Sequence, residues 1–235
     1  MPRPLKVVTW VAGVLVVVLV VGFLTVVWTI HRSFPQTSGT IDVAGLEQPV
    51  TVMRDGAGIP LIYADTSSDL FFAQGYVQAQ DRFFEMDFRR HLTSGTLSAM
   101  FGRTALKTDM FVRTLGWRRV AEDELALLAP ETRSYLQSYA DGVNAYLADR
   151  SGAELSLEYA VLRIDGLDST PAPWTPVDSL AWIKAMAWNL GSNIEDEIAR
   201  SLESTRLTPA EIGELYPPYP YATHLPIVNQ GAVVD

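Results

Sequence analysis

The sequence of 235 residues contains no cysteine and only three histidines. Without cysteine the chain forms no disulfides, thiolate metal sites or iron–sulfur clusters, and it has no cysteine nucleophile. Acidic residues outnumber basic residues by 27 to 18, which gives a net charge of -9. Because no surplus of cations is available to neutralise phosphates, we do not expect a nucleic acid among its partners.

Several catalytic signatures are also absent. No serine has glycines two residues before and after it, as the nucleophile elbow of α/β-hydrolases requires. The sequence has no phosphate-binding loop and no zinc-protease helix motif. His31 borders the first apolar run, His224 lies in a proline-rich tail, and His91 follows two arginines near a predicted helix end. A solvated histidine is favoured at such an end, so no histidine-based hydrolase is indicated.

The first positive feature is the uncharged stretch from Val7 to Ile30. As a helix it would cover about 36 Å, enough to cross a hydrocarbon core of about 30 Å. Trp10 and Trp28 lie near its two ends, where indole rings favour the headgroup level. A cleavable signal peptide is the alternative, but its apolar region would be shorter and a small-residue cleavage site would follow. We therefore expect residues 1–32 to be a single-pass anchor in the cell membrane, with the remaining chain outside the cytoplasm.

Beyond this anchor the pattern predicts an α+β fold that is mostly helical. Residues 33–39 form a polar tether, and residues 40–216 carry the folded region. Runs rich in β-branched residues around a glycine-rich turn predict a hairpin or meander with strands at Thr40–Val43, Val50–Arg54 and Leu61–Ala64. Apolar residues spaced by three and four predict helices, the first of them capped by Ser67 or Ser68. These predicted helices are Ser67–Leu92, Leu97–Phe101, Thr104–Leu115, Pro130–Leu147, Trp174–Trp188 and Ile194–Leu207.

Two groups of charged residues are candidates for chemistry. Glu85 and Asp87 each stand four residues before a basic partner, Arg89 and His91 respectively. Such pairs are typical of an exposed helix face, and we interpret them so. The three carboxylates of Glu195–Glu197 are either a site for a hard cation or a solvated helix start.

Four stretches of the chain resemble motifs of one enzyme family. They are Arg54–Ala64, Gly75–Asp87, Tyr139–Tyr146, and Trp174–Leu180 leading into Met186–Leu190. In order and spacing they resemble the penicillin acylase (penicillin amidase) family of N-terminal-nucleophile hydrolases, over about Val50 to Leu207. The similarity is to the α-subunit, the N-terminal part of the precursor. It implies an αββα enzyme, to which this portion contributes helices and a few edge strands.

The resemblance also implies where the chemistry lies. In this family the precursor cleaves itself, and the β-subunit then begins with a serine nucleophile whose own α-amine acts as the general base. The implied reaction is deacylation of N-acyl amides such as β-lactam side chains. That serine would lie beyond Asp235, with residues 217–235 as the start of a spacer peptide. This chain would then hold no catalytic residue, would be inactive alone and would have its own β-subunit as partner.

The resemblance assigns four binding residues to this chain. Met186 and Leu190 fall where an apolar pair contacts the acyl group, and Asn189 falls on the leaving-group side, where some members carry arginine. Glu197 matches the one α-subunit ligand of a calcium site completed by the β-subunit. An alignment shift would move that role to Asp196 or Glu195. No organic cofactor is implied.

Two alternatives remain open at the level of sequence. One is an acylase for N-acyl-homoserine lactones or lipopeptides on the same scaffold. The other is a membrane-tethered binding module without chemistry. A self-cleavage site in the reading frame soon after Asp235 would favour an enzyme, and a stop codon without a partner gene would favour the module.

Overall fold

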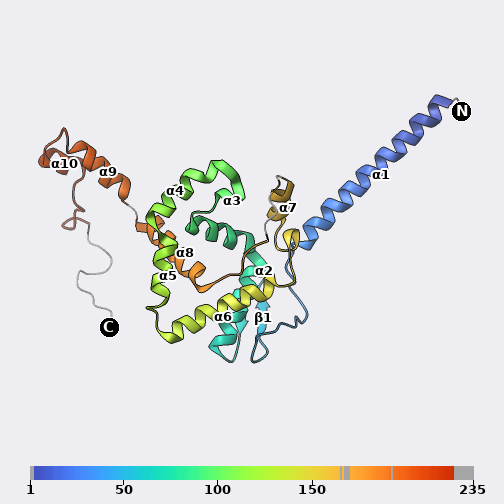
Figure 1. Ribbon diagram of the computed structural model, residues 1–235, viewed down its shortest axis with the longest axis horizontal. Helices are drawn as coiled ribbons and strands as arrows, with labels where there is room; N and C mark the ends of the chain where they lie inside the picture. The colour runs from blue at the N-terminus through green and yellow to red at the C-terminus, as the bar shows by residue number, and fades with distance from the viewer. Residues whose placement is uncertain (1–2, 165, 167–169, 192, 225–235) are drawn as a thin grey trace. The chain divides into compact units, whose positions relative to one another are not determined.

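The structure is a computed structural model that describes residues 3–164, 166, 170–191 and 193–224 (Figure 1). It divides into two compact units, Met1–Met186 and Ala187–Asp235. Helices dominate, so the mostly helical prediction is confirmed. In chain order the elements are α1 (Arg3–Arg32), β1 (Thr51–Arg54), β2 (Pro60–Tyr63), α2 (Ser67–Ser94), α3 (Ser98–Phe101), η1 (Gly102–Ala105), α4 (Leu106–Leu115), α5 (Trp117–Leu125), α6 (Pro130–Leu147), η2 (Gly152–Glu154), α7 (Leu157–Ile164), α8 (Pro176–Gly191), α9 (Ile194–Glu203) and α10 (Pro209–Leu215).

Helix α1 contains the long apolar stretch. Its segment Trp10–Arg32 spans 23 residues, and an 18-residue window within it has a mean hydropathy of 2.9 and is 0% buried. The segment is therefore long and apolar enough to cross a membrane. A signal sequence at the same place has the same properties, so the anchor stays a prediction.

Strands β1 and β2 form an antiparallel hairpin in which Thr51 pairs with Tyr63. The Asp55 carboxylate accepts hydrogen bonds from the backbone N–H groups of Ala57 and Ile59, both at 2.9 Å, which closes the turn. The hairpin prediction is confirmed. The predicted strand Thr40–Val43 is wrong, because in the described residues the sheet contains only β1 and β2.

Helix α2 begins one residue earlier than the predicted caps allow. Thr66, rather than Ser67 or Ser68, is the N-cap residue, and its hydroxyl accepts the N–H of Asp69 at 3.0 Å. The helix ends at Ser94, and Gly95 caps it with a φ of 63°, in the left-handed region that glycine adopts most easily. The backbone is non-helical at Arg82, so α2 bends in the middle of its length.

Helices α2 and α6 cross with their backbones in contact, and two glycines allow it. A Cβ atom on Gly75 would lie 2.1 Å from the carbonyl oxygen of Tyr139. A Cβ on Gly142 would lie 1.9 Å from the carbonyl oxygen of Phe72. Both distances are far inside van der Waals contact, so the crossing requires glycine on each helix.

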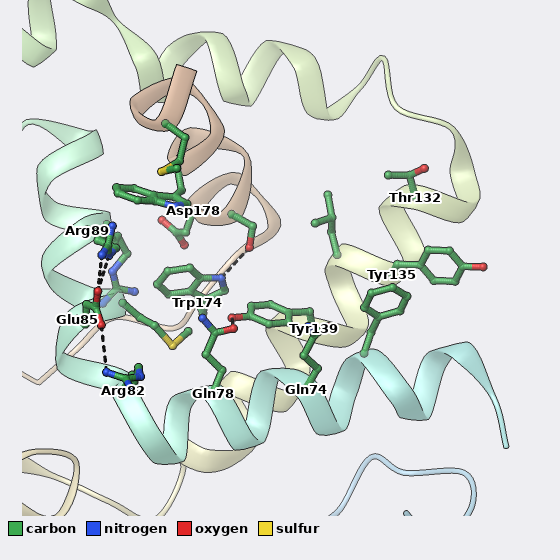
Figure 2. Close-up of a pocket in the computed structure, with 17 residues that line it drawn as sticks. Gln74, Gln78, Arg82, Glu85, Arg89, Thr132, Tyr135, Tyr139, Trp174 and Asp178 are labelled. Atoms are coloured by element: carbon green, nitrogen blue, oxygen red, sulfur yellow. Dashed lines mark hydrogen bonds and ion pairs between the residues drawn. The ribbon is translucent and has the colours of Figure 1, made fainter. Parts of the chain in front are cut away.

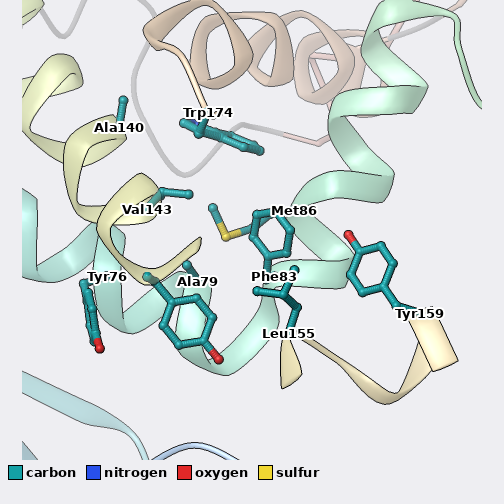
Figure 3. Packing of buried hydrophobic residues seen from close by; sticks show 10 residues of the cluster. Tyr76, Ala79, Phe83, Met86, Ala140, Val143, Leu155, Tyr159 and Trp174 are labelled. Carbon is teal, nitrogen blue, oxygen red and sulfur yellow. The ribbon is translucent and has the colours of Figure 1, made fainter. Parts of the chain in front are cut away.

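The main core lies beside this crossing (Figure 3). Phe83 from α2 and Val143 from α6 are almost fully buried in it. The remaining members come from the same two helices and from the chain that follows them. They are Tyr76, Ala79, Met86, Ala140, Tyr146, Leu155, Tyr159 and Trp174.

Three α-helices of the described residues lie outside the predicted ranges, namely α5, α7 and α10. Helix α5 follows directly after α4, with Gly116 at a φ of 72° between them. Thr208 is the N-cap of helix α10: its hydroxyl accepts the N–H of Glu211, while the Glu211 carboxylate accepts the N–H of Thr208. This reciprocal cap was readable in the sequence as Thr208 followed three residues later by a glutamate.

Candidate functional site

The first unit contains a cavity of about 870 Å³ between α2, α6 and α8 (Figure 2). Its walls combine aromatic rings and thioethers with several charged and amide side chains. The lining residues are Phe71, Gln74, Gln78, Arg82, Glu85, Met86, Arg89, Arg90, Thr132, Tyr135, Leu136, Tyr139, Trp174, Asp178, Ser179, Trp182 and Met186. A mostly apolar hollow with a few polar groups is typical of a small-molecule site.

Aromatic side chains on α6 and before α8 are held by hydrogen bonds. Trp174 donates its indole N–H to the Ser179 hydroxyl at 3.1 Å. Tyr139 donates its hydroxyl to the Gln78 amide oxygen at 2.8 Å. Burial raises the pKa of Tyr139 to about 12, so the phenol stays neutral and remains a donor across the physiological range. These rings offer an apolar surface with polar atoms already paired.

The opposite wall, on α2, carries charge. Glu85 pairs with Arg89 and lies 3.9 Å from Arg82, as the dashed lines of Figure 2 show. The Arg89 guanidinium lies 4.2 Å from the ring centroid of Trp182 on α8. This stacking joins α2 to α8 across the cavity.

Asp87 is not the exposed partner of His91 that the sequence predicted. Only 1% of Asp87 is exposed, and its nearest approach to the His91 ring nitrogen is 3.7 Å. Its carboxylate instead pairs with Arg90 and accepts a hydrogen bond of 2.6 Å from the Tyr159 hydroxyl. Burial, with the adjacent Asp87 charge, raises the pKa of Tyr159 well above its usual range. The predicted pair of Glu85 with Arg89 is confirmed.

Arg90 and Asn144 together fix the segment that leads into Trp174. Arg90 donates to the carbonyl oxygens of Ala172 at 2.7 Å and Pro173 at 3.3 Å. The Asn144 amide donates to the Trp174 carbonyl at 2.9 Å and accepts the Trp174 N–H at 2.7 Å. Since buried polar groups must be paired, these bonds set the position of the Trp174 ring in the cavity wall.

Helix α8 starts from a paired cap. The Asp178 carboxylate accepts the N–H of Thr175 at 2.7 Å and its hydroxyl at 2.8 Å. Arg118 on α5 donates to the same carboxylate at 2.6 Å. Asp178 is 2% exposed and lines the cavity, so this ion pair places a neutralised charge in the cavity wall.

The predicted substrate-binding residues fall on α8, on either side of the boundary between the units. Met186 is 36% exposed and lines the cavity of the first unit. Asn189 and Leu190 belong to the second unit, are exposed, and are not among the lining residues. Leu190 has 76% of its surface exposed. The sequence reasoning missed Asp87, Arg90 and Asn144, although Asp87 and Arg90 continue the buried spacing of Phe83 by four and seven residues.

Glu197 lies in the first turn of α9 and is exposed. Its carboxylate accepts hydrogen bonds from Asn193 at 3.1 Å and from Arg200 at 2.6 Å. In the part of the chain that the structure describes, no three acidic or histidine side chains are close enough to hold a metal ion. A calcium site at Glu197 would therefore need most of its oxygen ligands from elsewhere.

Comparison with known proteins agrees with the motifs. Residues 49–232 match the family model for penicillin amidase. The chain therefore belongs to the penicillin amidase family, whose members hydrolyse amides. It is 37% identical over 163 residues to the penicillin acylase 2 proenzyme of Pseudomonas sp. (strain SE83), covering 69% of this chain and 20% of that protein. It is 35% identical over 189 residues to the acyl-homoserine lactone acylase QuiP of Pseudomonas aeruginosa, covering 80% of this chain and 22% of that protein.

A solved structure is similar as well. The chain aligns with the thermostable penicillin G acylase from Alcaligenes faecalis at a TM-score of 0.59 and 30% identity. The alignment covers 81% of this chain and 97% of the matched chain. By contrast, the chain spans about a fifth of the length of the curated relatives that it matches.

Proposed function

We propose that this chain is the α-subunit part of an acylase that hydrolyses an amide bond between an acyl group and an amine. The observation that carries the proposal is the aromatic cavity of the first unit, lined by Met186, in a chain of the penicillin amidase family. A "proenzyme" among the relatives, and a solved chain covered over 97% of its length, support a partner subunit released from the same precursor.

The chemistry belongs to that β-subunit. Its N-terminal serine attacks the amide carbonyl, and the serine's α-amine takes the hydroxyl proton through water. The proton passes to the departing amine, the acyl group remains as an ester, and water then hydrolyses this ester. The 235-residue chain alone is expected to be inactive, since it supplies binding surface and no nucleophile.

From the family resemblance we assign Met186 and Leu190 to the acyl side of the substrate and Asn189 to the leaving-group side. Asn189 is neutral at a position where some members of the family carry arginine. A neutral amide offers no ion pair to the carboxylate of a β-lactam nucleus, which favours uncharged amines. The second candidate substrate is therefore an N-acyl-homoserine lactone, supported by the similarity to an acylase for that class; lipopeptides fit the same argument.

The test is acyl-chain selectivity in the matured enzyme. Met186→Ala, which shortens a side chain in the cavity wall, should shift kcat/KM toward longer acyl chains by roughly 10- to 200-fold relative to short ones. Leu190→Ala should shift it in the same direction where Leu190 contacts the acyl group in the matured enzyme. Ile183→Ala is the matched control, because Ile183 is 56% exposed on the same helix and does not line the cavity. Equal losses for short and long acyl amides would reject the acyl-binding role.

A second proposal concerns Glu197, which supplies one ligand to a Ca²⁺ site completed by the β-subunit. Binding there requires Glu197 to exchange its contact with Arg200 for the cation. Glu197→Gln should lower the calcium content of the matured enzyme and slow its processing. If Asp196→Asn does so and Glu197→Gln does not, the ligand is Asp196.

Residues 1–32 are proposed as the membrane anchor, residues 33–39 as its tether, and the rest of the protein as lying outside the cytoplasm. Residues 217–235 are proposed as the start of the spacer peptide, and of these 225–235 lie outside the described residues. The full-length protein should stay with membranes through a carbonate wash. A soluble product beginning near residue 33 would show a cleaved signal peptide instead.

A further inference from the structure

Helix α7 lies next to the end of α1 that would leave the membrane. Arg32, the last residue of α1, stacks its guanidinium 4.3 Å from the ring centroid of Trp28 and pairs with Glu154. Glu154 closes the short turn η2, which is followed directly by Leu155 and then α7. The hydrogen bond from Arg32 lowers the pKa of Glu154, so this carboxylate stays charged and paired. Both η2 and α7 contact α1.

The inner side of α7 is fixed by the core. Tyr159 is 3% exposed, and its hydroxyl donates to the buried Asp87. Its ring meets Phe84 edge to face, with the centroids 5.4 Å apart. Leu155, just before the helix, is also 3% exposed. These contacts fix which side of α7 faces the core of the first unit.

The outer side of α7 is apolar and uncovered in the first unit. Leu157, Val161 and Ile164 are 37%, 55% and 84% exposed. At about 100° per residue they fall within about 60° of one another, on the side opposite to Tyr159. Glu158 and Arg163 are exposed as well, Glu158 about 60° from Val161 and Arg163 about 100° from Ile164 around the helix. A short helix with an apolar face between charged borders is typical of a helix lying in a membrane interface.

We propose that the outer face of α7 docks onto the lipid surface beside the anchor and so fixes the orientation of the first unit on the membrane. This inference rests on the proposal that α1 spans the bilayer. The support for this proposal is that α7 follows closely on the end of the anchor. Arg32 lies at the end of the apolar run, and its ion pair with Glu154 keeps η2 beside that end. Three extended residues reach at most about 11 Å, so the start of α7 cannot be far from the headgroup layer. The cavity lined by Met186 would then be held in one fixed orientation toward the membrane.

Site-specific labelling can test this, because the chain has no cysteine to remove. An environment-sensitive fluorophore is attached in separate full-length variants to Val161→Cys on α7, Leu19→Cys within α1 and Asp123→Cys on the exposed surface of α5. Each variant is reconstituted into phosphatidylcholine vesicles carrying a nitroxide either near the headgroup or near the bilayer centre. The label at residue 161 should emit to the blue of the label at 123 and be quenched more by the shallow nitroxide. The label at 19 should be quenched more by the deep one.

The outcomes separate the two proposals. Quenching of the label at residue 19 without quenching of the label at 161 would support the anchor and overturn the docking of α7. A blue-shifted but unquenched label at 161 would also overturn it, since a protein surface would then cover α7. No quenching at 19 would reject the anchor, and with it the docking.

A charge variant sharpens the result. Ile164→Asp, made in the chain labelled at residue 161, should remove the blue shift and the shallow quenching while the chain still floats with vesicles. Ile183→Asp is the matched control, since Ile183 is an exposed isoleucine on a different helix. If the label at residue 161 keeps the same blue shift and shallow quenching with Ile164→Asp as with Ile183→Asp, lipid docking by this face is rejected.

Discussion

The two units of the chain differ in how they hold their side chains. In the first unit two helices cross in backbone contact at Gly75 and Gly142, and charged groups such as Asp87 are buried with partners. In the second unit none of the described residues is buried. Several of its large apolar residues are open to solvent, with Leu190, Ile198 and Leu202 at 76%, 54% and 66% exposure.

The first unit therefore fixes its own geometry through buried contacts, whereas the second unit leaves apolar side chains exposed. Trp174 keeps its place in the cavity wall through Arg90 and Asn144, within the first unit alone. No comparable buried network holds Leu190 or Glu197 among the described residues of the second unit. Folded domains rarely leave so much apolar surface open, which favours a partner surface over the second unit.

The largest expected effect breaks the helix crossing of the first unit. Gly142→Ala puts a methyl group where only 1.9 Å separates it from the Phe72 carbonyl oxygen, and neither backbone can yield without parting the helices. We expect a loss of about 3 kcal/mol in unfolding free energy. In the second unit, Gly213→Ala meets no atom within 4 Å and should be neutral or slightly stabilising, as alanine is in a helix. Denaturant melts of both variants measure this, and equal effects would contradict the contrast.

A matched pair of tyrosines gives the next effect. Tyr159→Phe removes a hydroxyl donor from the buried charge of Asp87, and should cost about 1.5–3 kcal/mol of stability. Tyr216→Phe removes a similar bond of 3.1 Å to Glu203 in the second unit, at a partly solvated site where water replaces it. We expect at most about 0.5 kcal/mol there. If melting curves show that Tyr216→Phe lowers the unfolding free energy as much as Tyr159→Phe does, the two hydroxyls are equally well buried and the contrast between the units is wrong.

Much of the first unit was readable from the sequence because local signals agreed with the final packing. The apolar spacing from Phe72 to Met86 gave α2, and the turn at Asp55–Pro60 gave the hairpin. The cap was misplaced because Thr66, Ser67 and Ser68 all carry hydroxyls, and only the backbone angle at Thr66 decides between them. The strand at Thr40–Val43 failed since β-branched residues without a neighbouring strand have nothing to pair with.

The cavity depended on tertiary contacts that no local pattern carries. Asp87 and His91 have the four-residue spacing of an exposed ion pair on a helix. The contact that shows Asp87 to be buried comes from Tyr159, which lies in a distant segment of the chain. The bonds from Arg90 and Asn144 to the chain around Trp174 likewise join residues far apart in sequence. Motif resemblance pointed to Met186 through its place in the family, and its position in the cavity wall came from the fold.

The smallest expected effect on stability tests the open face of the second unit. Ile198 and Leu202 lie four residues apart on α9, so they share one face, and both are more than half exposed. Replacing both with serine should change the unfolding free energy of the chain by no more than about 0.5 kcal/mol, because exposed side chains contribute little packing. The same change should reduce binding of a hydrophobic dye and, in the matured enzyme, weaken association of the two subunits. Val143→Ala in the buried core is the control, and should cost about 1 kcal/mol or more without altering dye binding by the native state. A serine variant that melts as early as Val143→Ala would mean that α9 is packed within the chain itself and needs no partner to cover it.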